Sequence, residues 1–382
     1  MGKNRAVAKE SLPVRIIVVV GARPNIVKVA PLLPAFAKAG ITADVAFTGS
    51  RTLTEDPRGD GDDQLGTVSF HGITIPTPTW FLDIGEGTNA VTTGAALVAL
   101  EELLATERPD AVLAVGDVDP TLALVIAAAK LRLPVAHLEA GMRCGNFALP
   151  DEINRVLISR VTSLHLACDE TSIANLIAEG TDPERIVLVG SMLAESVILH
   201  AEGIRKLDAA AAYGLTRCAY VLAGFHRVEN LSDHGRMQSI LDGLGAIDLP
   251  VLLPDAAGVG AAVEKFGLRV PASVRLVDPV NYHDMLALLR DAAVAVTDSS
   301  GVQEETCMLD TPCVTVRPCT ERAAPLIGGA NRLCDANVEA VVSAVDDALA
   351  GPRRWLRPKR WDKAVSQRVV RSIKRGVPPL GE

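Results

Sequence analysis

The chain has 382 residues, of which 48% are hydrophobic and 22% charged, and its formal net charge is −8. This length exceeds what one hydrophobic core usually organises, so two domains are expected. The acidic balance argues against a nucleic-acid partner, because such proteins neutralise phosphates with a large basic surface. No apolar run reaches the roughly 18 residues that a membrane span needs, so no membrane partner is expected.

The first 13 residues contain three basic side chains but no apolar segment that would complete a secretory signal, so we expect a cytoplasmic protein. Seven cysteines occur without a Cys-x-x-Cys pair. An odd number without that spacing predicts reduced thiols rather than a disulfide framework or a zinc site.

Short runs rich in Val, Ile and Leu alternate with helical stretches, which is typical of βαβ units and a parallel sheet covered on both faces. In the first half we predict strands at Val14–Gly21, Asp44–Ser50, Asp110–Asp117, Pro134–Ala140 and Leu164–Asp169. The intervening helices are expected near Pro31–Ala39, Asn89–Ala105 and Thr121–Lys130. The pattern restarts with strands at Tyr220–His226, Pro250–Pro254, Val274–Pro279, Val294–Asp298 and Cys313–Arg317.

This repetition predicts an α/β protein with two facing, doubly wound, Rossmann-like domains and a cleft between them. We place the first domain at residues 1–195 and the second at 196–351, with a C-terminal helix at about 352–382 joining the first domain. A helical segment at Leu193–Leu207 would bridge the halves, and the linker around it, near Gly190–Leu215, is predicted to flex when the cleft closes. The Gly- and Asp-rich stretch Arg51–Pro78 is expected to be a long loop.

In open α/β sheets, ligands bind outside the carboxyl ends of the strands, so the residues after each strand are the first candidates. After the first strand, Arg23 and Lys28 lie beside a predicted helix start, a favourable place for an anion. The sequence Gly-Ala-Arg-Pro-Asn there is not Gly-x-Gly-x-x-Gly, so NAD is not indicated.

Three carboxylates follow later strands of the first half. Asp117 and Glu139 end two apolar strands, and Asp151 opens a predicted helix shortly after Arg143, which is predicted to contact the ligand. Burying acids at strand ends is costly without a purpose, so we interpret these residues as paired or catalytic groups. Carboxylates that converge on one crevice suit proton transfer at carbon, where one group abstracts and another returns the proton.

The second half contributes groups suited to a phosphate. His226 ends a strand, where it would donate to a phosphate or act as an acid, and Ser299, Ser300 and Gly301 form a strand-to-helix turn that exposes backbone N–H groups. Three further residues complete the predicted nucleotide site. Glu305 is expected at ribose hydroxyls, Tyr282 in a loop near the base, and Arg322 facing the turn.

At this point the motifs resemble the UDP-N-acetylglucosamine 2-epimerase family, whose fold is of the GT-B type. The matching motifs, spread over about Val14 to Cys334, are Gly21-Ala22-Arg23-Pro24 with Lys28, Gly116-Asp117, His137-Leu138-Glu139-Ala140-Gly141-Met142-Arg143, Glu152-Ile153-Asn154-Arg155, His226-Arg227, Asp298-Ser299, Gln303-Glu304-Glu305 and Thr320-Glu321-Arg322. Eight motifs in register are a specific signal.

The resemblance implies elimination of UDP to a 2-acetamidoglucal and its re-addition after C2 is protonated on the other face. It places UDP on the second domain, with Arg23 reaching across, and gives the acid/base work to Asp117, Glu139 and Asp151. It also implies a homodimer, a UDP-sugar substrate, and no metal or redox cofactor.

Two departures from the family pattern concern the chemistry and its regulation. The family usually has Glu where this chain has Asp151, and it carries a Gln-His pair where Ser50-Arg51 stands here. Three alternatives to a non-hydrolysing epimerase therefore remain open at this stage. They are a hydrolysing relative that releases free ManNAc, a GT-B glycosyltransferase, and a sugar-nucleotide sensor without turnover.

Overall fold

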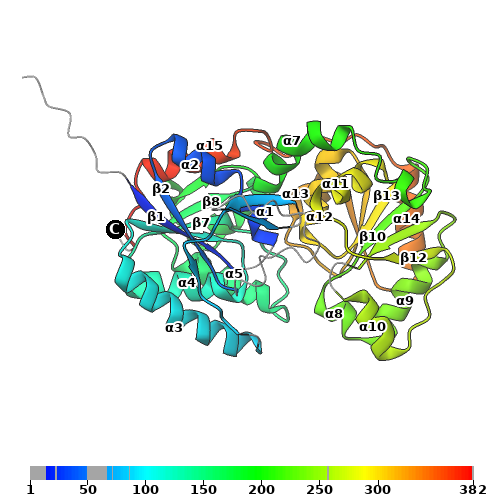
Figure 1. Cartoon of the computed structure of the whole chain (residues 1–382), viewed down its shortest axis with the longest axis horizontal. Helices are drawn as coiled ribbons and strands as arrows, with labels where there is room; N and C mark the ends of the chain where they lie inside the picture. The colour runs from blue at the N-terminus through cyan, green and yellow to red at the C-terminus, as the bar shows by residue number, and fades with distance from the viewer. Residues whose placement is uncertain are drawn as a thin grey trace, which may run out of the picture.

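A computed structural model describes residues 14–21, 24–49, 67–70, 72–85, 87–255 and 258–380. Two parallel β-sheets, each covered by helices, lie side by side along the long axis of the molecule (Figure 1). Contacts between the halves join the carboxyl end of a strand and the start of a helix in the first half to loops that follow strands in the second. The predicted pair of facing, doubly wound α/β units is therefore confirmed.

The first sheet has seven strands in the order β5-β2-β1-β6-β7-β8-β9, and every pairing in it is parallel. The strands are β1 Arg15–Val20, β2 Thr42–Phe47, β5 Trp80–Phe81, β6 Ala111–Val115, β7 Val135–Ala140, β8 Leu164–Ala167 and β9 Ile186–Leu188. All residues of β6, β7 and β8 are buried, as expected for a sheet with helices on both faces.

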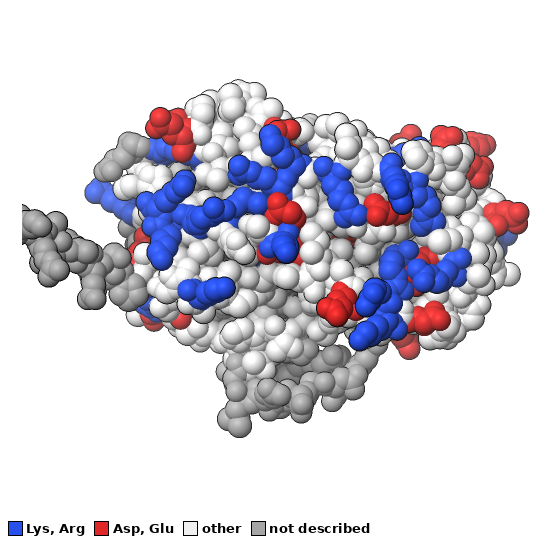
Figure 2. All heavy atoms as spheres, turned by 90° about the horizontal axis from the view of Figure 1, so that it is seen from above, with Lys and Arg blue, Asp and Glu red and all other residues white. Residues whose placement is uncertain are grey.

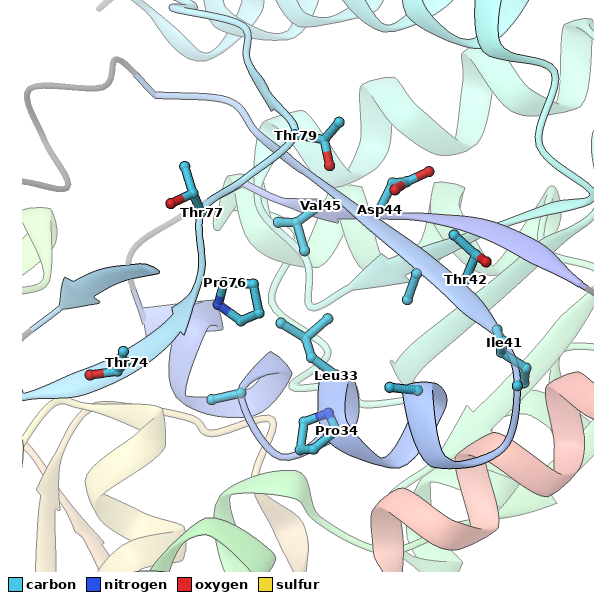
Figure 3. Close-up of a pocket in the computed structure, with 14 residues that line it drawn as sticks. Leu33, Pro34, Ile41, Thr42, Asp44, Val45, Thr74, Pro76, Thr77 and Thr79 are labelled. Atoms are coloured by element: carbon cyan, nitrogen blue, oxygen red, sulfur yellow. The ribbon is translucent and has the colours of Figure 1, made fainter. Parts of the chain in front are cut away.

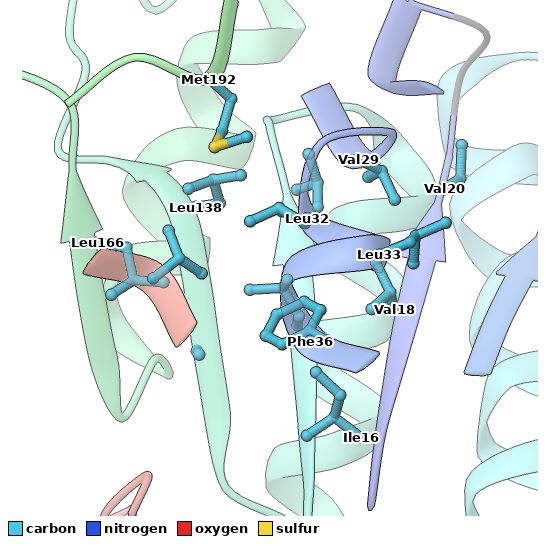
Figure 4. Close-up of a cluster of buried hydrophobic side chains, with 14 of the residues drawn as sticks. Ile16, Val18, Val20, Val29, Leu32, Leu33, Phe36, Leu138, Leu166 and Met192 are labelled. Carbon is cyan, nitrogen blue, oxygen red and sulfur yellow. The ribbon is translucent and has the colours of Figure 1, made fainter. Parts of the chain in front are cut away.

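The helices of this half are α1 Pro24–Val29, α2 Leu32–Lys38, α3 Asn89–Glu107, α4 Asp119–Lys130, α5 Pro150–Arg160 and α6 Glu170–Ala178, with a short 3-10 helix at Pro183–Arg185. Aliphatic side chains from β1 and β7 pack against α1 and α2 around the buried ring of Phe36 (Figure 4). This core fixes the strands whose ends carry the candidate acids.

The second sheet has six parallel strands in the order β12-β11-β10-β13-β14-β15. They are β10 Val221–Gly224, β11 Val251–Pro254, β12 Val274–Val277, β13 Val294–Thr297, β14 Cys313–Val316 and β15 Asn331–Cys334. The helices of this half are α8 Val228–Leu231, α9 His234–Gly245, α10 Val259–Phe266, α11 Tyr282–Asp291, α12 Ser300–Leu309, α13 Ala323–Ile327 and α14 Val338–Ala350, with a 3-10 helix at Ala211–Tyr213.

The sequence prediction differs from the structure at several elements. The edge strands β9 and β15 were not predicted, because each is only three or four residues long and partly exposed. Within the predicted loop Arg51–Pro78, β3 (Thr67–Phe70) and β4 (Ile73–Pro76) form an antiparallel hairpin, while residues 51–66 lie outside the described residues.

Helix α7 (Met192–Arg205) connects the halves, as predicted for the segment Leu193–Leu207. Its first residues, Met192 and Leu193, belong to the core of the first half, whereas Ala194 and Val197 pack into the second. One helix therefore contributes to both cores, and the flexing of the linker near Gly190–Leu215 stays a prediction.

The C-terminal helix is shorter than predicted, because α15 spans only Val365–Lys374. It packs against α2 and α7 and buries Val369 and Ile373 in the core of the first half. The preceding residues 351–364 contain two prolines, which disfavour a helix, and cross between the halves instead. The indoles of Trp355 and Trp361 hold this segment by donating to the carbonyls of Cys307 and Cys168.

Lys and Arg side chains form a band over the face on which α7 and α15 lie (Figure 2). Several are held by partners, as in Lys359 with Glu170 and Arg368 with Asp362. All seven cysteines carry free thiols, as predicted. Within the described ranges, no helix combines the length and the hydropathy needed to cross a bilayer.

Candidate active site

The carboxyl end of β6 is shaped by a left-handed glycine. Gly116 has φ +73°, which turns the chain out of the strand and directs Asp117 toward the second half. The carbonyl of Gly116 lies 2.8 Å from Nε2 of His137 on the neighbouring strand. Burial lowers the pKa of His137 to about 4, so the ring is neutral near pH 7 and donates this hydrogen bond. His137 thus fixes the peptide before Asp117.

Asp117 is held by one arginine. Its Oδ2 accepts a hydrogen bond of 2.9 Å from Nη1 of Arg155 on α5, and its side chain remains 30% exposed toward the cleft. The surrounding protein atoms remove water from the carboxyl and raise its pKa, and Arg155 only partly opposes this effect. A carboxyl whose pKa is raised binds and releases a proton more readily near the working pH, which suits proton transfer.

Glu139 ends β7 in an unusual backbone conformation and a strongly cationic environment. Its φ is +69°, a left-handed value that costs a residue with a side chain about 1–3 kcal/mol. Oε2 lies 2.7 Å from Nζ of Lys28, and Oε1 lies 3.3 Å from Nη1 of Arg322. Burial would raise the pKa of Glu139, but Arg322 and Lys28 together lower it to about 2. Glu139 is therefore ionised and joins the two halves.

The third predicted acid, Asp151, contacts the second half directly. It lies in the first turn of α5, and its Oδ2 is 2.7 Å from Nη1 of Arg227. The other terminal nitrogen of Arg227 donates to the Ser300 hydroxyl at 3.0 Å. A single guanidinium therefore contacts an acid of the first half and the predicted phosphate turn of the second.

The buried carboxylate of Asp298 organises the strand ends of the second half. It accepts hydrogen bonds from the backbone N–H groups of His226 and Arg227 and from the side chain of Asn230, at 2.8–3.1 Å. Nδ1 of His226 also lies 3.2 Å from Asp298. Burial lowers the pKa of His226 while Asp298 opposes this, and the ring stays 43% exposed at the cleft.

The predicted turn Ser299–Gly301 is the N-terminus of α12. Ser299 is the N-cap and accepts from the N–H of Val302. The Ser300 hydroxyl donates to the carboxylate of Glu321, a residue of the loop after β14. Free N–H groups and the positive end of a ten-residue helix favour an anion at this turn.

Arginines around this turn retain unused hydrogen-bond donors. Among the described residues, Nε of Arg227, Nη2 of Arg317 and Nε of Arg322 are buried without a hydrogen-bond partner. Buried N–H groups without a partner cost about 1–3 kcal/mol each, so an anionic ligand that accepts from them would be stabilised. The arrangement is chemically suited to a diphosphate.

Glu304 and Glu305 have different surroundings on α12. Glu304 accepts from Nη1 of Arg322 at 2.6 Å and from the hydroxyl of Ser191 at the start of α7. Burial raises the pKa of Glu305 to about 7. The Tyr282 hydroxyl interacts with Glu305 but makes no hydrogen bond of good geometry. Tyr282 therefore packs beside the predicted ribose residue.

One predicted binding residue, Arg143, does not join this cluster, and another, Arg23, lies outside the described residues. Arg143 is engaged within the first half, where its guanidinium contacts Glu179 at 2.8 Å twice and donates to Ser159 and the carbonyl of Met142. With its donors used in this way, Arg143 is not favoured as a ligand for UDP.

Sequence reasoning assigned no role to the charged partners that hold the acids. Arg155, Arg227, Glu304 and Glu321 occur within motifs quoted above, yet none was predicted as a site residue. Glu152 is a fifth case, because it accepts from Arg155 and from the backbone of Cys144 and Gly145. A local signal existed only for some of these residues, as in Arg227 directly after His226, because the arginines that contact Asp117 and Glu139 lie 38 and 183 residues away along the chain.

A groove of about 780 Å³ lies away from these residues, between α2, β2 and the segment after β4 (Figure 3). Aliphatic and threonine side chains such as Leu33, Thr42 and Thr77 line it, and Asp44 there is paired with Arg15. It lacks convergent charged groups, so the chemistry is assigned to the cleft. Among the described residues, no group of three His, Cys, Asp or Glu side chains has a geometry that would hold a metal ion.

Comparison with known proteins gives the family. Residues 59–374 match the model of the UDP-N-acetylglucosamine 2-epimerase family. The UDP-N-acetylglucosamine 2-epimerase of Methanocaldococcus jannaschii is 30% identical over 95% of this chain and 99% of its own length. The UDP-2,3-diacetamido-2,3-dideoxy-D-glucuronate 2-epimerase of Pseudomonas aeruginosa is 33% identical over 88% of this chain and 92% of its own length.

Solved structures agree with the sequence comparison. The crystal structure of the M. jannaschii enzyme in complex with UDP-GlcNAc and UDP superposes with a TM-score of 0.86, covering 95% of this chain and all of that one. The Rickettsia bellii enzyme, 24% identical, shares the fold with a TM-score of 0.80 over 96% of this chain and 97% of its own. The predicted GT-B-like fold is thus confirmed, and the chain belongs to the UDP-N-acetylglucosamine 2-epimerase family.

Proposed function

We propose that this protein interconverts UDP-GlcNAc and UDP-ManNAc without a metal or redox cofactor, by eliminating UDP and adding it back after proton exchange at C2. The observation that carries the proposal is the guanidinium of Arg227, which contacts Asp151 of the first half and Ser300 of the second. A sugar whose diphosphate lies at the turn Ser299–Gly301 would therefore have its ring beside acids of the first half.

In this mechanism the second half stabilises the departing UDP. The helix start at Ser299, Ser300 and Gly301 would bind the diphosphate, and His226 and Arg322 would offset the charge that develops as the anomeric C–O bond breaks. Arg23 is proposed to add a further cation. Glu305 would accept from the ribose, with Tyr282 packed beside it.

The first half would move the proton at C2. Asp117 is the preferred acid/base group, because its pKa is raised and its carboxyl is partly exposed to the cleft. Asp151, also from the first half, would serve the opposite face of the sugar. Glu139, ionised between Lys28 and Arg322, would hold the cations in place rather than carry the proton.

The test is incubation of purified protein with UDP-GlcNAc in D2O, followed by NMR and mass spectrometry. Formation of UDP-ManNAc with deuterium at C2 is expected, and Asp117→Asn should reduce it by about a thousandfold. Asp110→Asn, at the exposed opposite end of the same strand, is the matched control. Release of free ManNAc would instead indicate a hydrolysing enzyme, and binding without exchange a sensor.

A parallel incubation with UDP-2,3-diacetamido-2,3-dideoxy-D-glucuronate tests the sugar, because the P. aeruginosa relative acting on that compound is as similar as the M. jannaschii enzyme. Faster exchange at C2 of this uronate than of UDP-GlcNAc would replace the proposed substrate and leave the reaction unchanged. The homodimer and the cytoplasmic location stay predictions.

A further inference from the structure

Glu321 occupies a junction between the two halves. Its carboxylate is buried, and it accepts from Nη1 of Arg317 at 3.1 Å and from the Ser300 hydroxyl. Three more guanidinium groups lie close, with Nη2 of Arg227 and Nε of Arg322 at 3.8 Å and Nη1 of Arg155 at 3.9 Å. Arg155 belongs to the first half, so Glu321 reaches across the cleft.

Arg155 lies among three carboxylates, because its Nε donates to Glu152 at 2.9 Å and its Nη1 faces the other two. The same nitrogen, Nη1, lies 2.9 Å from Oδ2 of Asp117 and 3.9 Å from Oε2 of Glu321. Because a guanidinium attracts both acids, the charge on Glu321 competes with Asp117 for it. This competition requires the two halves to be together, since Glu321 and Asp117 come from different sheets.

We propose that Glu321 is a positioning residue that holds Arg155 between the halves and thereby sets the protonation of Asp117 when the cleft is closed. The inference rests on the proposed function and deepens it. Glu321 touches the phosphate turn through Ser300 and the acid through Arg155, so it links the site where UDP departs to the group that moves the proton.

The direction of the effect follows from the charges that face Asp117. Arg155 and Asp151 on α5, Lys28 on α1, and Glu321 from the loop after β14 all act on its pKa, and His137 on β7 lies nearby. The acids raise that pKa and the cations lower it. Removing the charge of Glu321 should therefore lower it, both directly and by freeing Arg155 to pair with Asp117.

The experiment compares Glu321→Gln with Arg155→Lys over pH 5 to 9. Glutamine retains an oxygen that accepts from Ser300, so KM should stay within about threefold of the wild-type value. In contrast, kcat should fall about tenfold, and the limb of its pH profile that reports Asp117 should move about one pH unit lower. Arg155→Lys weakens the opposing cation, and the same limb should move to higher pH. Asp310→Asn, an exposed acid of the second half paired with Arg357, is the control and should change neither.

The second measurement does not depend on turnover. In protein labelled with carboxyl ¹³C aspartate and saturated with UDP, the Asp117 resonance, assigned with Asp117→Asn, should titrate at lower pH in Glu321→Gln. Thermal unfolding checks that each variant is folded. If Glu321→Gln is unstable, Glu321→Asp serves as the second variant, and it should keep the Asp117 titration at its wild-type pH because it keeps the negative charge. An unchanged Asp117 titration in a folded variant overturns the inference, whereas failure of the wild type to exchange the C2 proton overturns only the proposed function.

Discussion

Two buried glutamates, one in each half, have carboxyls whose pKa values lie on opposite sides of the ordinary one. Glu139, at the end of β7, has a pKa of about 2, and Glu305, on α12, has one of about 7. Burial raises the pKa of both. Glu139 has Lys28 at 2.7 Å and Arg322 at 3.3 Å, whereas Glu305 has the Tyr282 hydroxyl and the acid Glu304 as neighbours.

Both carboxyls are buried, so the charges of their neighbours, rather than the extent of burial, decide whether each is ionised at neutral pH. Glu139 is a fixed anion that helps to join the halves. Glu305 changes its charge near neutral pH, and a hydrogen-bonding role toward a ribose depends on that charge. The four predictions below test this contrast.

The largest effect is expected for Glu139→Gln. The substitution removes the anion and leaves Lys28 and Arg322 as buried cations without their partner, which is strongly unfavourable. Because the two cations would then be misplaced relative to the substrate, we expect kcat for C2 exchange to fall about a hundredfold. Glu170→Gln, which removes an exposed partner of Lys359, should leave exchange unchanged. A Glu139→Gln rate within threefold of the wild type would contradict the assigned role.

The next effect concerns stability in acid. The pKa of Glu139 is lower in the folded state than in the unfolded chain, so its contribution is fully present above about pH 4.5 and is lost as the pH falls toward about 2. The free energy of unfolding, measured with urea, should fall between pH 6 and pH 3 in both proteins. The fall should be smaller by about 2–3 kcal/mol in Glu139→Gln than in the wild type. Equal losses in both proteins would show that the ion pairs do not hold this carboxyl.

Glu305 should give the opposite slope. Its pKa is raised on folding, so the folded protein binds more protons than the unfolded chain between about pH 4.5 and 7, and stability falls as the pH rises through that range. In Glu305→Gln the free energy of unfolding should fall by about 1–2 kcal/mol less between pH 5 and pH 7.5 than in the wild type, as measured by urea unfolding at both pH values. A steeper fall in the variant would reverse the assignment.

The smallest effect is expected away from the cleft. Asp310 pairs with Arg357 at 3.0 Å, but its side chain is 50% exposed, so water and salt weaken the attraction. Asp310 also ends α12 with φ +57°, a conformation that asparagine tolerates. Asp310→Asn should change the free energy of unfolding by less than about 0.5 kcal/mol. A loss above about 1 kcal/mol would show that exposed pairs matter as much as buried ones.

The sequence by itself determined the class of fold and the places where chemistry occurs. Apolar runs of strand length, separated by helical segments, predict parallel sheets because only strands covered on both faces are apolar throughout. Polar residues at the ends of those runs, such as Asp117, Glu139 and Ser299, predict the ligand edge because parallel strands end together. These signals are local, so a single chain carries them.

The tertiary structure alone decided which of these groups is a paired anion and which is a poised acid. Glu139 and Asp117 look alike in sequence, and their difference comes from Arg322 and Arg155, which lie 183 and 38 residues away along the chain. Likewise, Arg143 was predicted to contact the ligand but is occupied by Glu179. An electrostatic effect depends on distance in space, and that distance is fixed only when the two halves pack against each other.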